Sequence, residues 1–172
     1  VTELDGFVPK VYASRPNMYC YKKVDGEILS EIISIDIFES FLKKCNELWT
    51  CKELEVSGQE RFYDGCLKFY KDKTYKRLNL FYKNFNKIDN AEIINGVSMP
   101  SLDSLLDKVD WMNISKGLAG RFHGDLHFEN VLYSKKNKSF TFLDWRQDFA
   151  GDLSIGDIYY DLSKILHGLI VN

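Results

Sequence analysis

The sequence lacks several features that define large classes of protein. It has no apolar run near the ~20 residues that cross a bilayer, and its start, VTELDGFVPK, shows no signal-peptide pattern. Its net charge is only −2, with 23 Lys and Arg against 25 Asp and Glu. A surface for nucleic acid or for an anionic membrane is therefore not expected. These observations predict a cytoplasmic protein whose partners are small molecules.

Metal-binding cysteine motifs and glycine-rich phosphate loops are also missing. The four cysteines form no CxxC pair, and Cys45 and Cys66 fall on apolar helical positions, which predicts buried thiols. None of the 11 glycines forms a GxGxxG motif. The segment GDLSIGD at 151–157 is not a P-loop, because Asp157 stands where the motif requires Lys.

The most informative segment is FHGDLHFENVLYSKKNKSFTFLD, residues 122–144. Asp125 and Asn130 are separated by a loop, and Asp144 ends the apolar run that follows. A β-hairpin over this segment would bring the three side chains together at one end. Phosphoryl transfer needs one carboxylate to accept the proton of the attacking hydroxyl and oxygen ligands to hold Mg²⁺ on the nucleotide phosphates.

Two motifs here resemble those of a known family. HGDLHFEN followed by LDW is similar to the catalytic and metal-binding loops of the aminoglycoside phosphotransferase and choline kinase family, which is related to the protein kinases. GDIYYDLSK, residues 156–164, resembles the Gly-Asp-x-x-x-Asp-Leu segment of the same family. The resemblance implies the following roles: Asp125 as catalytic base, Asn130 and Asp144 as metal ligands, and His123 and Asp161 as structural supports of the catalytic loop.

The resemblance also implies a protein-kinase-like α+β fold. Residues 1–26 would be the last strands of a small lobe and the hinge, and residues 27–172 a mainly helical large lobe with a catalytic β-hairpin. In the hinge, Lys22, Lys23 and Val24 would meet the adenine through their backbone groups. The glycine-rich loop and strand lysine of the small lobe would lie upstream of Val1. We therefore expect the 172-residue chain alone to have little or no kinase activity.

Apolar periodicity predicts the scaffold. VPKVYAS and MYCYKKV read as a hairpin, and Ser34 as the N-cap of a core-facing helix. A longer helix is expected after Gly58, with one buried stripe. Asn95-Gly96 predicts a turn, followed by a helix with Pro100 in its first turn that continues to Val109. The stripe is predicted to comprise Phe62, Cys66, Phe69, Leu78, Tyr82 and Phe85.

The expected function is transfer of the γ-phosphate of ATP or GTP, with Mg²⁺, to a hydroxyl of a sugar, amino sugar or amino alcohol. Gly124 stands where protein kinases that are switched by activation-loop phosphorylation carry Arg, which favours a small-molecule kinase. His127 and Glu129 are candidate substrate contacts.

Two alternatives remain open. The chain is also compatible with a noncatalytic kinase-like module that binds a metabolite or a protein. In addition, HGDLH matches a His-x-Asp-x-His cluster, which with Asp144 could hold zinc or manganese for hydrolysis.

Overall fold

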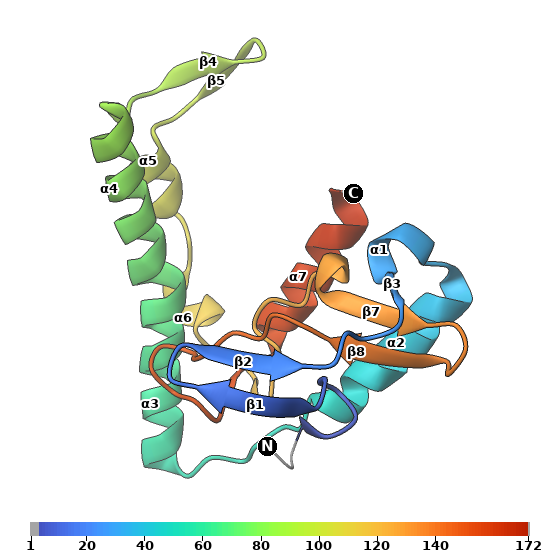
Figure 1. Ribbon diagram of the computed structural model, residues 1–172. Helices are drawn as coiled ribbons and strands as arrows, with labels where there is room; N and C mark the ends of the chain where they lie inside the picture. The colour runs from blue at the N-terminus through green and yellow to red at the C-terminus, as the bar shows by residue number, and fades with distance from the viewer. Residues whose placement is uncertain (1–3, 172) are drawn as a thin grey trace. The chain divides into compact units, whose positions relative to one another are not determined.

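The computed structural model describes residues 4–171, which form two compact units. One unit contains the chain up to Glu53 and the chain from Leu118 onward, and the other is Leu54–Gly117. The first unit mixes helices and strands, as the α+β prediction requires (Figure 1). The lobe boundary expected after residue 26 stays a prediction.

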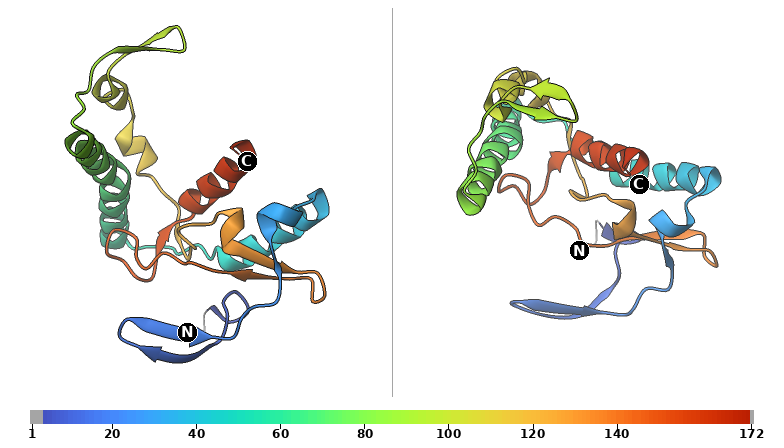
Figure 2. Two further views of the ribbon diagram at one scale, coloured as in Figure 1. Left: turned by 45° about the horizontal axis from the view of Figure 1, so that its top comes forward. Right: turned by 90° about the horizontal axis from the view of Figure 1, so that it is seen from above.

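The first unit begins with the predicted hairpin. Strand β1 (Val11–Arg15) pairs antiparallel with β2 (Met18–Tyr21), and Arg15 lies opposite Met18 across the turn. Every residue of both strands is exposed. In both views of Figure 2 this ribbon stands apart from the other strands of the unit, in agreement with its pairing as a separate sheet.

A three-stranded antiparallel sheet holds the segment that the sequence singled out. Its order is β3 (Glu27–Ile28), β7 (Val131–Ser134) and β8 (Ser139–Phe142). Val131 pairs with Phe142, so the hairpin is in the predicted place and the lysine-rich turn lies at its far end. The short helix α1 (Leu29–Ile32) follows β3, and a 3-10 turn, Phe128–Asn130, precedes β7.

Helix α2 (Ile35–Leu48) packs behind this sheet (Figure 1). Ser34 caps it as predicted, because its hydroxyl accepts a hydrogen bond from the Ile37 N–H at 3.4 Å. Phe41 is fully buried, with its ring centroid 5.7 Å from that of Phe140 and 6.1 Å from that of Phe142. The core of the unit comprises Phe7, Leu29, Phe41, Cys45, Leu48, Leu126, Phe128, Val131, Phe140, Phe142 and Ile165.

The last helix, α7 (Ile158–Ile170), is fixed at its start by a small strand pair, β6 (Ala119–Gly120) with β9 (Gly156–Asp157). The Asp157 carboxylate caps α7 by accepting from the Tyr159 N–H at 3.0 Å, and it also accepts from the Leu118 N–H at 2.8 Å. A Cβ atom on Gly156 would lie 2.3 Å from the Phe122 ring. Only glycine therefore allows β9 to approach Phe122 so closely.

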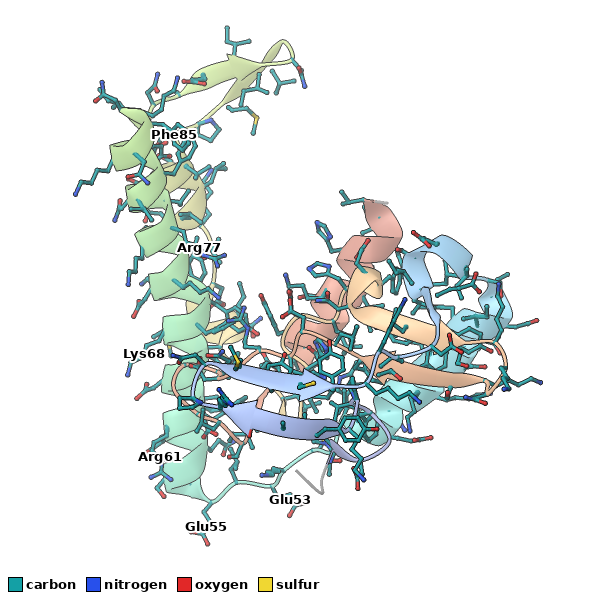
Figure 3. The ribbon with its side chains drawn as sticks, in the orientation of Figure 1. Glu53, Glu55, Arg61, Lys68, Arg77 and Phe85 are labelled. Atoms are coloured by element: carbon teal, nitrogen blue, oxygen red, sulfur yellow. The ribbon has the colours of Figure 1, made fainter. Side chains whose placement is uncertain are left out.

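The second unit is mostly helical. Helix α3 (Val56–Leu67), a π-helical segment (Lys68–Asp72) and α4 (Lys73–Phe85) follow one another directly. Figure 3 shows Arg61, Lys68, Arg77 and Phe85 in succession along them. The hairpin of β4 (Glu92–Ile94) and β5 (Val97–Met99) precedes the short helices α5 (Leu102–Leu106) and α6 (Trp111–Ile114). Within residues 4–171, no helix is long and apolar enough to cross a membrane.

The predicted stripe on the long helix is correct for its first half only. Phe62, Cys66 and Phe69 are buried, whereas α4 buries no residue and Phe85 is 64% exposed. Leu78 and Tyr82, which belong to the predicted stripe, are half-buried, and the stripe ends at the exposed Phe85. The helix also begins at Val56, before Gly58.

The turn after this helix is as predicted, but the next helix is shorter. Asn95 and Gly96 both have positive φ, 52° and 79°, as a two-residue hairpin turn requires. Helix α5 starts at Leu102, so Pro100 precedes it. The helix ends at Leu106, before the predicted end at Val109. Ser101 is the N-cap, since its hydroxyl accepts from the Ser104 N–H at 3.3 Å.

Removing the central ring of the first unit should be strongly destabilising. Phe41→Ala would leave a cavity among buried aromatic rings, so we expect a loss of about 3–5 kcal/mol in the free energy of unfolding. Denaturation in urea measures it. Ile35→Ala on the same helix is the control, because Ile35 is 80% exposed and its loss should change stability by roughly 0.5 kcal/mol or less. Equal effects of the two changes would contradict the assigned core.

Candidate active site

The register of the hairpin brings the predicted site residues to one end of the sheet. The Leu143 N–H donates to the Asn130 carbonyl at 2.8 Å, one step beyond the Val131–Phe142 pair. The Asn130 side-chain amide donates to the Asp125 carbonyl at 2.8 Å. Asp125, Asn130 and the residue before Asp144 are therefore joined by backbone and side-chain hydrogen bonds.

Asp161 holds the loop from the first turn of α7. Its two carboxylate oxygens accept hydrogen bonds from the N–H groups of His123 and Gly124, both at 2.7 Å. The Trp49 indole N–H donates to the same carboxylate at 3.0 Å. Asp161 is fully buried, and burial raises its pKa to about 6, although the three hydrogen bonds act to lower it. This is the geometry that the resemblance implies for a supporting carboxylate.

His123 is buried between the loop that carries Asp125 and the strand end that precedes Asp144. Its Nε2 lies 2.8 Å from the Leu143 carbonyl, and its Nδ1 accepts from the Asp125 N–H at 3.2 Å. These bonds require the tautomer with the proton on Nε2. Burial lowers the pKa of His123 to about 4, so the ring is neutral at pH 7. His123 therefore ties the loop that carries Asp125 to the strand end that precedes Asp144.

The backbone on both sides of the site is conformationally unusual. Asp144 has φ of 56°, the left-handed region that few non-glycine residues adopt. Gly124 has φ of 85°, and a Cβ atom there would lie 2.4 Å from the Cβ of Arg146. The Arg146 guanidinium Nε donates to the Gly124 carbonyl at 3.1 Å, and its backbone N–H donates to the His123 carbonyl at 3.0 Å. Such strained positions cluster at functional sites.

The Asp125 carboxylate faces a cation that the sequence reasoning did not identify. The Lys164 ammonium lies 3.2 Å from Asp125 Oδ1 and 3.1 Å from His127 Nε2, and that His127 nitrogen lies 3.3 Å from the same Asp125 oxygen. Burial acts to raise the pKa of Asp125, but the hydrogen bond and charge of Lys164, together with the charges of His127 and Arg146, hold that pKa below its usual value. Asp125 is therefore ionised at pH 7.

A signal for Lys164 was present in the sequence. Lys164 follows Asp161 by three positions, and residues three apart on a helix share one face. If Asp161 contacts the loop of residues 123–130, a residue one helical turn later on the same face of α7 is expected to lie near that loop as well. Trp49 carried no such signal, because it ends α2, far away in the sequence.

The contacts of the residues predicted to bind nucleotide or substrate do not define a role for them. Lys22 and Lys23 are exposed and Val24 is half-buried, in the segment between β2 and β3. Glu129 is exposed within the 3-10 turn, and His127 precedes that turn. Their proposed contacts with nucleotide and substrate stay predictions.

The geometry gives no support to a zinc or manganese hydrolase. In the part of the chain that the structure describes, no group of three or more His, Cys, Asp or Glu side chains could hold a metal ion. The His127 nitrogen that a metal would need is instead within hydrogen-bonding distance of Lys164. Cys45 and Cys66 are buried free thiols, as predicted.

Removal of the Asp161 carboxylate should destabilise the protein. Asp161→Ala leaves the buried N–H groups of His123 and Gly124 unpaired, so we expect a loss of about 1–3 kcal/mol in the free energy of unfolding at pH 7. Thermal and urea denaturation measure it. Glu39→Ala is the control, since Glu39 is an exposed carboxylate on α2. Unchanged unfolding of Asp161→Ala would contradict the supporting role.

The contribution of Asp161 should also depend on pH. A pKa raised from 3.8 to about 6 means that the folded state binds the proton more tightly than the unfolded state. The part of the stabilisation that depends on protonation is therefore greatest below pH 3.8 and is lost as the pH rises through about 6, whereas the hydrogen bonds to His123 and Gly124 remain. We expect the stability difference between wild type and Asp161→Ala to shrink from pH 4 to pH 7 in urea denaturation. A difference that grows with pH would show that the hydrogen bonds outweigh burial.

Comparisons with known proteins agree with this geometry. Residues 102–170 match the family model described as the phosphotransferase enzyme family. Searches of curated proteins and of solved structures found no match. The matched segment contains the loop of residues 123–130, the β7–β8 hairpin and all of α7, which are the elements that form the candidate site. The resemblance to the phosphotransferase enzyme family, a family of kinase-like enzymes, is therefore confirmed over residues 102–170.

Proposed function

We propose that this protein transfers the γ-phosphate of ATP or GTP to a hydroxyl group of a small molecule. Asp125 is the base that orients the hydroxyl and accepts its proton. Asn130 and Asp144 are the magnesium ligands, and His123 and Asp161 support the loop. A sugar, an amino sugar or an amino alcohol is the class of acceptor that the family resemblance suggests.

One observation carries this proposal: an ionised carboxylate lies beside a fixed amide side chain at the end of a hairpin. Asp125 is held by hydrogen bonds through its N–H and its carbonyl, to His123 and Asn130 respectively. The backbone of Asp125 is therefore held in place, and its side chain, 35% exposed, is accessible to a substrate. A general base needs both properties, since the proton must be within hydrogen-bond reach in the bound complex.

The residues present fit a magnesium ion. The Asn130 side-chain nitrogen donates a hydrogen bond to the Asp125 carbonyl, so the side-chain oxygen of Asn130 remains able to bind a metal ion. Asp144 is exposed, two residues after Phe142, and Phe142 pairs with the residue that follows Asn130. Two oxygen ligands suit Mg²⁺, which usually binds through one or two protein groups together with water and phosphate oxygens. When bound, the ion would neutralise charge on the nucleotide phosphates.

The remaining parts of the proposal concern substrate binding. Backbone groups of Lys22, Lys23 and Val24 would meet the adenine, because this exposed segment leads from β2 into the sheet that carries the site. His127 and Glu129 follow Asp125 in the loop and are candidates for contacts with the acceptor. Gly124 leaves no arginine for a regulatory phosphate, which favours a small-molecule acceptor over a protein.

A noncatalytic binding module is the weaker alternative. Loss of catalysis in such modules would be expected to relax the constraints on the base and metal ligands. Here Asp125, Asn130 and Asp144 are all present, and the buried groups that hold the loop are fully paired. No observation on the described residues favours the noncatalytic function.

Loss of the proposed base should lower turnover without abolishing nucleotide binding. In the full gene product we expect Asp125→Asn to reduce turnover about 100-fold or more, because general-base assistance contributes about that factor. The measurement is nucleoside diphosphate release with a panel of sugars, aminoglycosides and choline. Nucleotide affinity, measured by calorimetry, should change little.

Asp144→Asn distinguishes the base from the metal ligand. It should weaken magnesium-dependent nucleotide binding as well as turnover, whereas Asp125→Asn should affect turnover alone. Normal turnover of Asp125→Asn would remove the proposed base. Metal-independent nucleotide affinity in both variants would remove the proposed magnesium site.

A further inference from the structure

Lys164 occupies a position that the proposed reaction does not yet explain. Its ammonium lies 3.2 Å from the oxygen of the proposed base and is 25% exposed. It extends from α7 one turn after Asp161, whose carboxylate is bonded to the backbone of the same loop. The position of the ammonium relative to Asp125 is therefore set by a buried attachment.

The catalytic loop supplies no cation of its own. Residues 124–130, GDLHFEN, contain neither Lys nor Arg. Phosphoryl transfer spreads negative charge over the equatorial oxygens of the transferring group, and positioned cations are the usual means of stabilising it. Another nearby cation, Arg146, donates through Nε to the Gly124 carbonyl and lies over the Tyr160 ring, 5.8 Å from its centroid.

We propose that Lys164 is a catalytic residue whose ammonium binds the transferring phosphoryl group. This inference rests on the proposed function. The attacking hydroxyl must lie ~2.6–3.2 Å from Asp125 to give up its proton. Because Lys164 already lies 3.2 Å from Asp125, an oxygen of the phosphoryl group approaching that hydroxyl comes within reach of the ammonium.

The step balances with these groups. The acceptor oxygen forms a bond to the γ-phosphorus while the bond from that phosphorus to the β–γ bridging oxygen breaks. The electron pair of the broken bond stays on the nucleoside diphosphate, and the acceptor proton passes to the Asp125 carboxylate. Lys164 keeps its three protons throughout and exchanges its contact with Asp125 for one with the phosphoryl oxygens.

The Lys164 contacts also distinguish this role from a purely structural one. Lys164 is bound to Asp125 and His127 by side-chain contacts at a partly exposed position, whereas the loop backbone is held by Asp161 and His123. Removal of the lysine should leave the loop in place. A partly exposed ion pair contributes little to stability, so folding should be almost unaffected.

The test compares binding of a ground-state and a transition-state ligand in the full gene product. The probes are Mg²⁺ with ADP or GDP, whichever the wild type binds, without and with aluminium fluoride, which mimics the transferring phosphoryl group. We expect Lys164→Met to weaken the fluoride complex about 100-fold or more and the diphosphate complex by less than about twofold. Calorimetry measures both, and Lys164→Arg should recover much of the loss.

Lys135→Met is the matched control. Lys135 pairs with Glu27 at 2.6 Å on the exposed side of the sheet, so its loss removes the same charge and the same kind of ion pair away from the site. It should change neither complex. Thermal unfolding of all variants checks that they are folded.

The outcomes separate this inference from the proposed function. If the wild type binds neither diphosphate, the proposed function fails and the inference fails with it. If the wild type binds the fluoride complex tightly and Lys164→Met binds it equally well, only the role of Lys164 is overturned. Equal weakening of both complexes, together with a lower unfolding temperature, would assign Lys164 a structural role instead.

Discussion

The site depends on one buried interaction, the pair of hydrogen bonds from the N–H groups of His123 and Gly124 to the Asp161 carboxylate. These N–H groups lie in a loop whose backbone cannot pair within a strand or helix, so without Asp161 they would be buried and unsatisfied. Three donors on one carboxylate offset part of the cost of burying this charge. The two hydrogen bonds from His123 and Gly124 also determine which face of α7 contacts the loop, and hence where Lys164 lies.

Close backbone approach follows from the same constraint. Gly124 adopts a positive φ beside Arg146, and Gly156 lies against the Phe122 ring where a Cβ atom would collide with it. Glycine at both positions allows the loop and the start of α7 to come close enough for the Asp161 bonds to form. His123 then carries the constraint onward, since its ring connects the Asp125 N–H to the Leu143 carbonyl. The proposed base and the strand end that precedes Asp144 are thus linked by the buried His123 ring.

Much of this could be predicted from the sequence because it is local. Asp125 and Asn130 come just before one hairpin and Asp144 just after it, and the alternation of FTF and the polar turn determine its register. Ser34 and the Asn95-Gly96 turn were predictable for the same reason. The predictions that were wrong involve positions where local patterns compete with other contacts. Pro100 lies outside α5 because Asp89 and Ser101 cap that helix at Leu102, and Phe85 is exposed on α4, a helix that buries none of its residues.

The sequence by itself determined the residues on which the proposed chemistry depends: the proposed base, the proposed metal ligands and the supporting carboxylate follow from residue types at fixed spacing along short segments. Tertiary structure alone decided what surrounds that chemistry. Trp49 reaches Asp161, and Lys164 reaches Asp125, only because α2 and α7 pack against the same sheet and loop. Spacing along the chain specifies contacts within a hairpin or a helical turn, whereas contacts between distant elements depend on how their buried faces pack.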